Sequence, residues 1–214
     1  MSKKRRNILL AFIIPALLFY VVFWISPVLM SFYYGLTNWR GMGDFDIVGM
    51  KNYANLIKQG TLFNSMGNTI KYTLFVVIWG NIQALALAMI LNMKLKARGV
   101  FRTIFYIPAL FSTIVVAFLW SYVYAPHYGM ISEIFNLFGS SNAPNLLGSK
   151  ATSLFAAAFV ETWKTSGTMT IIYLAGLQNI SEEVIESAKI DGCNGWQAIR
   201  YVKIPMLANT ITDR

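Results

Sequence analysis

Two ionisable side chains within an apolar stretch are the first candidates for chemistry in this chain. Glu161 and Lys164 lie near the middle of residues 151–177, which are otherwise long and apolar enough to cross a membrane. Ionisable groups are costly inside a bilayer and usually face a bundle interior or water. Because they are three positions apart, the two side chains can pair on one helix face. Two hypotheses stay open: a structural ion pair that offsets its own burial, or a solute pathway that these residues line with Trp163 or Thr165.

The side chains of such a pathway would suit a sugar. Charged and hydroxyl groups can form hydrogen bonds with sugar hydroxyls, and an aromatic ring can cover the apolar face of a sugar ring. Two amide side chains in the apolar stretch 72–93 are further candidates, although hydrogen bonding between helices is their commoner use. The candidate pathway residues are Asn81, Gln83, Glu161, Trp163 and Lys164.

Patterns for catalysis or metal binding are absent from the sequence. It contains no Gly-x-x-x-x-Gly-Lys phosphate-binding motif and no metal-ligand spacing. Its one histidine, His127, lies at the edge of an apolar run, where a solvated role is the ordinary one. The single cysteine, Cys193, excludes an intrachain disulfide and leaves the redox compartment open. We expect no catalytic residue, metal or cofactor, and an integral membrane enzyme has no support in these residues.

Composition predicts the elements that hold these residues. The chain has 214 residues, of which 56% are hydrophobic and 13% charged, whereas a soluble domain carries about 25% charged residues. The apolar residues come in long uncharged blocks, which places the chain among all-α integral membrane proteins. We predict about four complete transmembrane helices, a polar helical segment and the start of a fifth span. The four spans are residues 8–32, 72–93, 103–125 and 151–177.

The first apolar run is interpreted as a retained span and not as a cleaved signal peptide. Residues 8–32 form a run of 25 residues without a clean small-residue cleavage site, whereas the apolar region of a signal peptide has about 7–15 residues. Residues 33–71 are predicted to be a loop with one short helix near 53–57. Residues 126–150, rich in Gly, Ser, Asn and Pro, are predicted to be a second loop.

The basic residues predict an orientation. The formal net charge is +9, and 12 of the 18 Lys and Arg residues fall within 3–6, 94–102 and 189–214. The first two clusters abut apolar spans and the third follows one. Basic residues beside spans mark the cytoplasmic side, so the N-terminus is predicted to be cytoplasmic. The same positions argue against nucleic acid as a partner, since no basic face remains outside the membrane prediction.

Residues 181–205 are predicted to form a helix, a turn and a second helix. Ser181 is a good N-cap, and Glu182 and Glu183 fall in the first turn, where the helix dipole favours negative charge. Gly192 can adopt a left-handed conformation that ends the helix. Pro205 marks the join to the next apolar run.

The first helix of this segment is amphipathic. Val184, Ile185 and Ala188 share one face, and the charged residues share the other. Something apolar is therefore covered by the helix, but lipid, neighbouring spans and a partner protein fit this pattern equally. In the second helix the residues at helical spacing are Trp196, Ile199 and Lys203.

The segment resembles the cytoplasmic EAA loop of ABC importer permeases. That family pattern is Glu-Ala-Ala, three residues, Gly, nine residues and Ile-x-Leu-Pro. Here residues 186–188 read Glu-Ser-Ala, three residues lead to Gly192, and nine more lead to Val-Lys-Ile-Pro at 202–205. Every spacing fits. The departures are small or conservative: Ser187 for alanine, Val202 for isoleucine and Ile204 for leucine.

Further likeness points to the carbohydrate-type, binding-protein-dependent members of that family. The run Ala188–Gly192 is similar to their Ala-x-Ile-Asp-Gly pattern, although Cys193 stands where alanine is usual. The likeness covers nearly the whole chain as far as about Ala208, where family members continue into further spans, so we expect a C-terminally incomplete permease. Shorter runs that also resemble the group are 31–33, 37–39, 101–103, 163–164 and 174–178. The resemblance implies an N-terminal span with an external loop over 1–67 and the importer transmembrane domain over 68–214.

The resemblance implies a transport role in a bacterial plasma membrane. Its partners would be cytoplasmic ATPase subunits, a second, different permease subunit, an external solute-binding protein and membrane lipid. The segment 181–205 would form a coupling helix that docks on an ATPase. The residues implied in that coupling are Glu186, Ser187, Ala188, Asp191, Gly192, Ile204 and Pro205. The alternative is a non-transport membrane scaffold or receptor component, whose segment 181–205 only rests on the bilayer.

Overall fold

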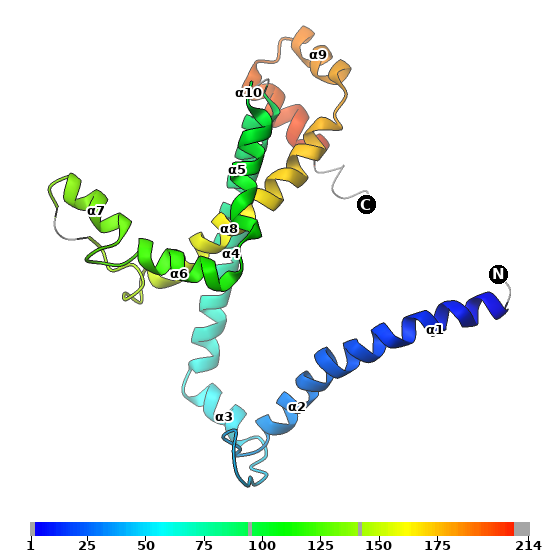
Figure 1. Ribbon diagram of the computed structural model, residues 1–214, viewed down its shortest axis with the longest axis vertical. Coiled ribbons are helices and arrows are strands. Elements are labelled where there is room, and N and C mark those ends of the chain that lie inside the picture. Colours follow the sequence, from blue (N-terminus) through cyan, green and yellow to red (C-terminus); the bar gives the residue numbers. More distant parts are fainter. Residues whose placement is uncertain (1–2, 94–95, 141–142, 208–214) are drawn as a thin grey trace. The chain divides into compact units, whose positions relative to one another are not determined.

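The structure is a computed structural model that describes residues 3–93, 96–140 and 143–207 (Figure 1). Over these residues it is all-helical, as predicted, and the only β interaction is one isolated antiparallel bridge between Thr37 and Ile47. The chain divides into two compact units, Met1–Gly67 and Asn68–Arg214. We describe each unit by itself.

The first unit begins with a long helical stretch of three consecutive elements. These are α1 (Lys3–Tyr20), the π-helical turn η1 (Val21–Ile25) and α2 (Ser26–Gly35). The π turn ends at Ile25, two residues before Pro27, which has no N–H to donate to the helix. Residues Ala11–Gly35 are long and apolar enough to cross a membrane.

A loop and the short helix α3 (Lys51–Lys58) follow, close to the helix predicted near 53–57. The side-chain amide of Asn52 donates hydrogen bonds to the carbonyls of Gly35, at 2.9 Å, and Thr37, at 2.8 Å. These bonds satisfy carbonyls at the end of α2 that have no helical partner. They also hold the start of α3 against that end.

The next helix, α4 (Thr61–Asn92), is longer than the predicted span 72–93. It has 32 residues and is also long and apolar enough to cross a membrane. Much of the predicted loop 33–71 is thus helical, in α2, α3 and the first turns of α4. Asn64 and Asn68 are polar, so the sequence analysis did not extend the apolar run of α4 back to its first turns.

Residues 103–125, predicted as one span, do not form one continuous helix. They belong to α5 (Arg98–Leu110) and α6 (Thr113–Val123), which meet at an angle of 100°. Phe111 and Ser112 have extended backbone conformations, and the Ser112 hydroxyl accepts a hydrogen bond from the N–H of Val115. Ser112 is therefore the N-cap of a new helix, and the apolar run turns there.

Two further helices follow in the second unit. The short helix α7 (Met130–Leu137) lies within the predicted loop 126–150, and α8 (Ser153–Gln178) corresponds to the predicted span 151–177. By length and apolar composition, two described helices could cross a membrane, or three if the bent pair α5–α6 counts as one span. The α8 helix has 26 residues but is less apolar, so the four-span topology remains a prediction.

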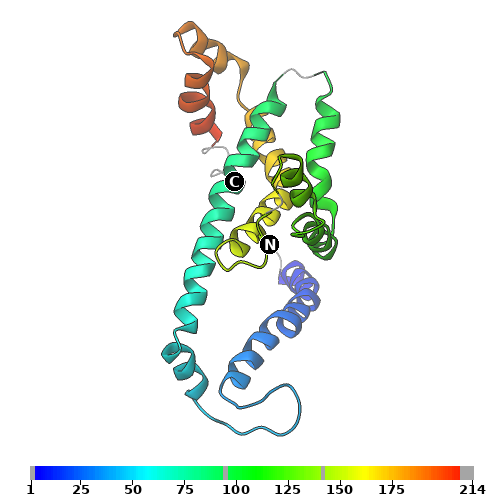
Figure 2. The ribbon, with the colours of Figure 1, turned by 90° about the vertical axis from the view of Figure 1, so that its left-hand side faces the viewer.

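The α8 helix packs between α4 and α5 (Figure 2). It approaches α5 most closely at Gly167, where a Cβ would lie 2.3 Å from the carbonyl oxygen of Phe105. It meets α4 at Gly80, which faces Thr162 at ordinary contact distance. Small residues allow membrane helices to pack at such short range. Two buried clusters form the core. One contains Ala88, Leu91, Leu174, Leu177, Ile180 and Leu207, and the other Val123, Tyr124 and Ala156.

Candidate functional site

A cavity of about 270 Å³ lies between α6 and α8 in the second unit. Both ionisable residues of α8, Glu161 and Lys164, line it. From the other side α6 contributes aromatic and hydroxyl groups. The residues that matter below are Thr113, Trp120, Ser121, Tyr124, Glu161 and Lys164. Carboxylate, ammonium, hydroxyl and aromatic groups thus meet around one space, which is the chemistry that a polar solute with apolar ring faces requires.

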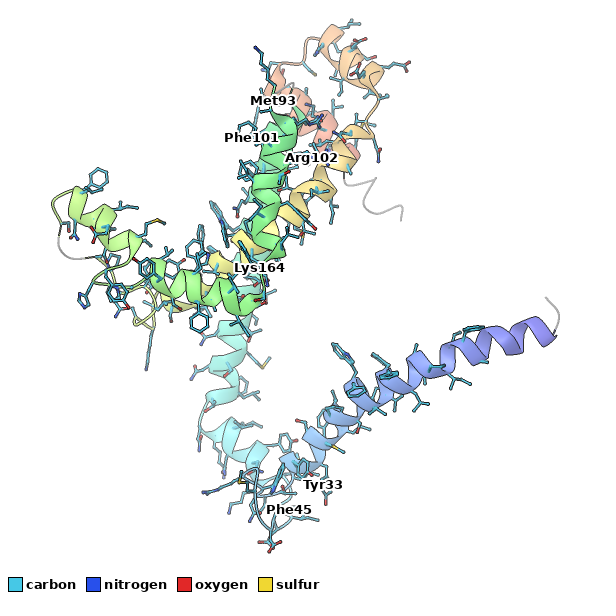
Figure 3. The ribbon with its side chains drawn as sticks, viewed as in Figure 1. Tyr33, Phe45, Met93, Phe101, Arg102 and Lys164 are labelled. Carbon is cyan, nitrogen blue, oxygen red and sulfur yellow. The ribbon has the colours of Figure 1, made fainter. Side chains whose placement is uncertain are left out.

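Glu161 and Lys164 do not pair with each other in the structure. The Nζ atom of Lys164 instead donates a hydrogen bond to the Oγ1 atom of Thr113, at 2.6 Å. Figure 3 shows Lys164 where α8 passes the junction of α5 and α6. The lysine therefore fastens α8 to the first residue of α6, and the Glu161 carboxylate is left free to accept hydrogen bonds in the cavity.

Trp163 does not line the cavity but supports it. Its ring packs edge to face on Trp120, with ring centroids 5.4 Å apart. Trp120 also contacts Tyr124, at 5.1 Å, and Phe159, at 5.6 Å. The indole Nε1 of Trp120 is buried and has no hydrogen-bond partner in the structure. The sequence analysis missed Trp120, because a tryptophan in an apolar run carries no local signal of its neighbours.

The two amide candidates on α4 have other surroundings. Asn81 accepts a hydrogen bond from the hydroxyl of Tyr173 on α8, and its own amide donates to the carbonyl of Val77, at 2.6 Å. Asn81 therefore joins two helices. The Oε1 atom of Gln83 is buried without a partner. Neither residue lines the cavity beside Glu161.

The segment that follows α8 has the predicted order of helix, turn and helix. Helix α9 (Glu182–Ile190) has Ser181 as its N-cap residue, although the serine side chain makes no capping bond. Gly192 has φ +84°. The N–H of Gly192 donates to the carbonyl of Lys189, at 3.1 Å, and that of Cys193 to Ala188, at 2.9 Å. This pair of bonds is a Schellman motif, which ends the helix sharply.

The second helix has a cap that the sequence analysis overlooked. It comprises α10 (Gly195–Ala198) and the π turn η2 (Ile199–Lys203), and continues as helix to residue 207. The side chain of Asn194 accepts from the N–H of Gln197, at 2.9 Å, and the side chain of Gln197 accepts from the N–H of Asn194, at 2.8 Å. This is a capping box, and the spacing of its two residues was available in the sequence.

The apolar face predicted for α9 packs largely against the chain itself. Ile185 contacts the core cluster of α4 and α8, and Ala188 is buried. The second helix returns to the same cluster through Leu207. The most exposed apolar side chains of the segment are Ile190 and Trp196, with 85% and 68% of their surfaces exposed, and Val184, Tyr201 and Ile204 are exposed as well. Ile190 and Trp196 thus lie on either side of the turn between the two helices.

The residues implied in coupling lie along this outer edge, with one exception. Glu186 and Ser187 are exposed on α9, and Asp191 and Gly192 are exposed at the turn. Ala188 is buried beneath them. Ile204 and Pro205 are exposed in the second helix.

Together these features define an all-helical integral membrane protein with a polar helix–turn–helix segment fixed to its core. The chain belongs to the family of binding-protein-dependent transport system inner membrane components, whose model matches residues 61–212. This agrees with the resemblance carried by the EAA-like segment.

Similarity to curated proteins indicates which kind of transport component the chain resembles. The chain is 30% identical over 201 residues to the probable starch degradation products transport system permease protein AmyD of Thermoanaerobacterium thermosulfurigenes, covering 94% of this chain and 68% of that protein. It is 31% identical to the multiple sugar-binding transport system permease protein MsmF of Streptococcus mutans, covering 94% of this chain and 69% of that protein. With the trehalose/maltose permease protein MalF of Thermococcus litoralis, identity is 33% over 91% of this chain and 66% of that protein. These relatives are transport permeases, which is consistent with a non-catalytic subunit.

The fold also matches solved structures. A bacterial ABC transporter involved in the import of the acidic polysaccharide alginate aligns with a TM-score of 0.79, covering 97% of this chain and 70% of that chain at 23% identity. The alginate transporter in complex with an alginate pentasaccharide-bound periplasmic protein gives a TM-score of 0.78. At this identity the likeness establishes the fold alone.

Proposed function

We propose that the chain is a membrane-spanning permease subunit of an ATP-driven importer for a sugar or a similar polar solute. The observation that carries this proposal is the construction of segment 181–205. Its turn exposes Ile190 and Trp196, while Ile185 and Leu207 lie against the core of α4 and α8. When a partner moves such a segment, the contacts with the core transmit the movement to the membrane helices. The sugar permeases among the relatives support the solute class.

The partner that moves segment 181–205 would be a separate cytoplasmic ATPase. The exposed carboxylates of Glu182, Glu183 and Glu186 flank the apolar turn, so a basic rim around an apolar groove is the complementary surface. We further propose a cytoplasmic N-terminus, four spans, an importer domain over 68–214, a second permease subunit and an external solute-binding protein. The family membership supports this assembly.

The cavity between α6 and α8 is the proposed part of the solute pathway. The Glu161 carboxylate would bind solute hydroxyls, and the rings of Trp120 and Tyr124 would cover the apolar face of the solute. Lys164 would change partners between Thr113 and the solute. Trp163 would hold Trp120 in place, and Asn81 would hold α4 against α8.

A crosslinking experiment tests the assembly and its orientation together. A photoactivatable maleimide attached to Cys193, the single cysteine, should capture an ATPase subunit in membranes that also contain the importer's other subunits. Mass spectrometry would identify the captured chain, and a chain carrying Cys193→Ser is the control. Cys193 is partly buried, so Ser187→Cys in that control background provides a second, exposed attachment point.

Two results would contradict the proposal. Capture of lipid alone from both positions, in membranes that contain a functional ATPase, would favour the membrane scaffold with a resting amphipathic helix. Labelling of both positions by an impermeant reagent applied outside intact cells would overturn the orientation.

The pathway role of Lys164 predicts different outcomes for the two partners of its hydrogen bond. Lys164→Met should reduce uptake by about 10–100-fold, since a hydrogen bond to a charged group contributes about 1.5–3 kcal/mol. Thr113→Val removes the acceptor but leaves the ammonium, and should keep uptake within about twofold of the unchanged chain. Uptake of radiolabelled solute, normalised to the amount of chain in the membrane, measures both. Equal losses in the two variants would mean that the bond serves only to fasten α8 to α6.

A further inference from the structure

The short helix α3, in the first unit, has an apolar face that protein does not cover. Helical spacing places Tyr53, Leu56 and Ile57 on one side and Lys51 and Lys58 on the opposite side. Leu56 is 42% exposed and Ile57 is 53% exposed. A soluble helix would turn these side chains inward, so their exposure needs an explanation.

Both ends of α3 are fixed to the ends of apolar helices. At its start, Asn52 donates its two hydrogen bonds to the carbonyls of Gly35 and Thr37, where α2 ends. At its finish, only Gln59 and Gly60 separate it from α4. A helix of eight residues is about 12 Å long. It therefore links the ends of two helices that are each long and apolar enough to span a membrane.

The apolar side of α3 is turned toward the end of α2. The phenol of Tyr53 packs against Gly35, where its hydroxyl would lie 2.5 Å from an added Cβ. Because Tyr53 shares its side of the helix with Leu56 and Ile57, that side is turned toward the end of α2. The two lysines lie on the opposite side of the helix, and both are exposed.

Aromatic side chains gather at the same level of the unit. The ring of Tyr34 stacks on Trp39 with centroids 4.3 Å apart. Phe45 packs edge to face on Tyr33, Tyr34 and Trp39, and Figure 3 shows Tyr33 and Phe45 together near the end of α2. Tyrosine and tryptophan concentrate where a bilayer meets water. The loop 36–50 and α3 thus share the composition of a membrane interface.

We propose that α3 is an interfacial helix whose occupant is phospholipid. Leu56 and Ile57 contact the upper acyl chains, and the lysines lie among the phosphates and water. Lys51 and Lys58, on the side opposite the apolar face, suit anionic headgroups. Anchored in this way, α3 fixes the spacing between the ends of α2 and α4. The proposal requires only that these two helices span the membrane, and it does not depend on the proposed transport function.

Spin labels on the two sides of α3 test the proposal. Ile57→Cys and Asn55→Cys, each in a chain carrying Cys193→Ser, would be labelled with a nitroxide and reconstituted in phosphatidylethanolamine–phosphatidylglycerol vesicles. Both residues are exposed and lie in the same helix, so they are matched. Collisions with oxygen report lipid, and collisions with a water-soluble nickel complex report water. We expect the label at 57 to lie about 5–10 Å below the headgroup boundary and the label at 55 to lie in water.

Other results would overturn the proposal. Equal exposure of both labels to the nickel complex would place the apolar face in water. Shielding of the label at 57 from both reagents would mean that protein covers it, and shielding that arises only on addition of the solute-binding protein would identify a docking surface. Leu56→Cys repeats the measurement at a neighbouring position and must agree with 57.

Discussion

Replacing Gly192 with proline should reduce ATP-driven uptake by more than about tenfold while the chain still inserts into the membrane. Gly192 has φ +84°, whereas proline fixes φ near −65°. Its N–H donates to the carbonyl of Lys189, and proline has no N–H. Asp191 has φ −69° and ψ 2°, whereas a following proline favours an extended ψ of about +120° to +160°. Loss of the left-handed turn and its hydrogen bond costs more than about 1.4 kcal/mol, which corresponds to a factor of ten.

Gly195 provides a matched control three positions away. It is the first residue of α10, the position at which proline is tolerated in a helix. Asn194 before it is extended, as the residue before proline should be, and nothing lies within 4 Å of an added Cβ. Gly195→Pro should therefore keep most of the uptake.

Solute uptake and ATP hydrolysis by the assembled importer, with the chain quantified in the membrane, compare the two variants. If both prolines reduced uptake equally, or neither did, the turn at Gly192 would have no special part in coupling. A third variant, Gly192→Asn, should retain intermediate activity because asparagine tolerates the left-handed region.

Replacing Gly167 with alanine should lower the thermal stability of the chain. An added Cβ would lie 2.3 Å from the Phe105 oxygen and 2.8 Å from the Cα of Tyr106, so it would meet backbone that cannot rotate away. Helices α5 and α8 would have to move apart, and overpacking of this kind costs about 1–3 kcal/mol. The midpoint of thermal unfolding in mild detergent should fall by about 4–8 °C if the cost is about 2 kcal/mol.

Gly80→Ala is the control for this prediction. Gly80 also faces α8, but its added Cβ would meet the Thr162 methyl at 3.5 Å, an ordinary contact. Alanine is the better helix former by about 1 kcal/mol, so this variant should match or exceed the stability of the unchanged chain. An unchanged midpoint for Gly167→Ala would mean that α5 and α8 are further apart than described. Retention of the folded chain on size exclusion after heating would measure both variants.

Features determined by a few neighbouring residues could be predicted from the sequence. The turn at Gly192 follows from glycine's access to positive φ, and the length of the apolar runs indicated membrane helices. The capping box of Asn194 and Gln197 belongs to this class as well, although it was overlooked. The predicted orientation and span count are also sequence arguments, and they remain predictions.

Features that depend on distant residues could not be predicted. Lys164 bonds Thr113, 51 positions away, whereas the sequence offered only its near neighbour Glu161. An apolar run has the same composition whether its helix is straight or bent, so composition did not reveal the break at Ser112. The only local sign of the break was the serine itself, which is a common N-cap residue. Periodicity groups residues on one face but does not say what covers that face. Hence the inward packing of Ile185 was not predicted from the pattern of α9.

Segment 181–205 is held at both of its ends. Ile180 precedes it, Leu207 follows it, and both lie in the core of α4 and α8. A segment attached to the core at only one end would follow a partner's movement without transmitting force to the membrane helices. In the proposed coupling role, a segment held at both ends and stiffened by its turn and its cap would act as a lever, so that a force on Trp196 would rotate the end of α8. The stiffness of these few residues would then determine how much of a partner's movement reaches the membrane helices.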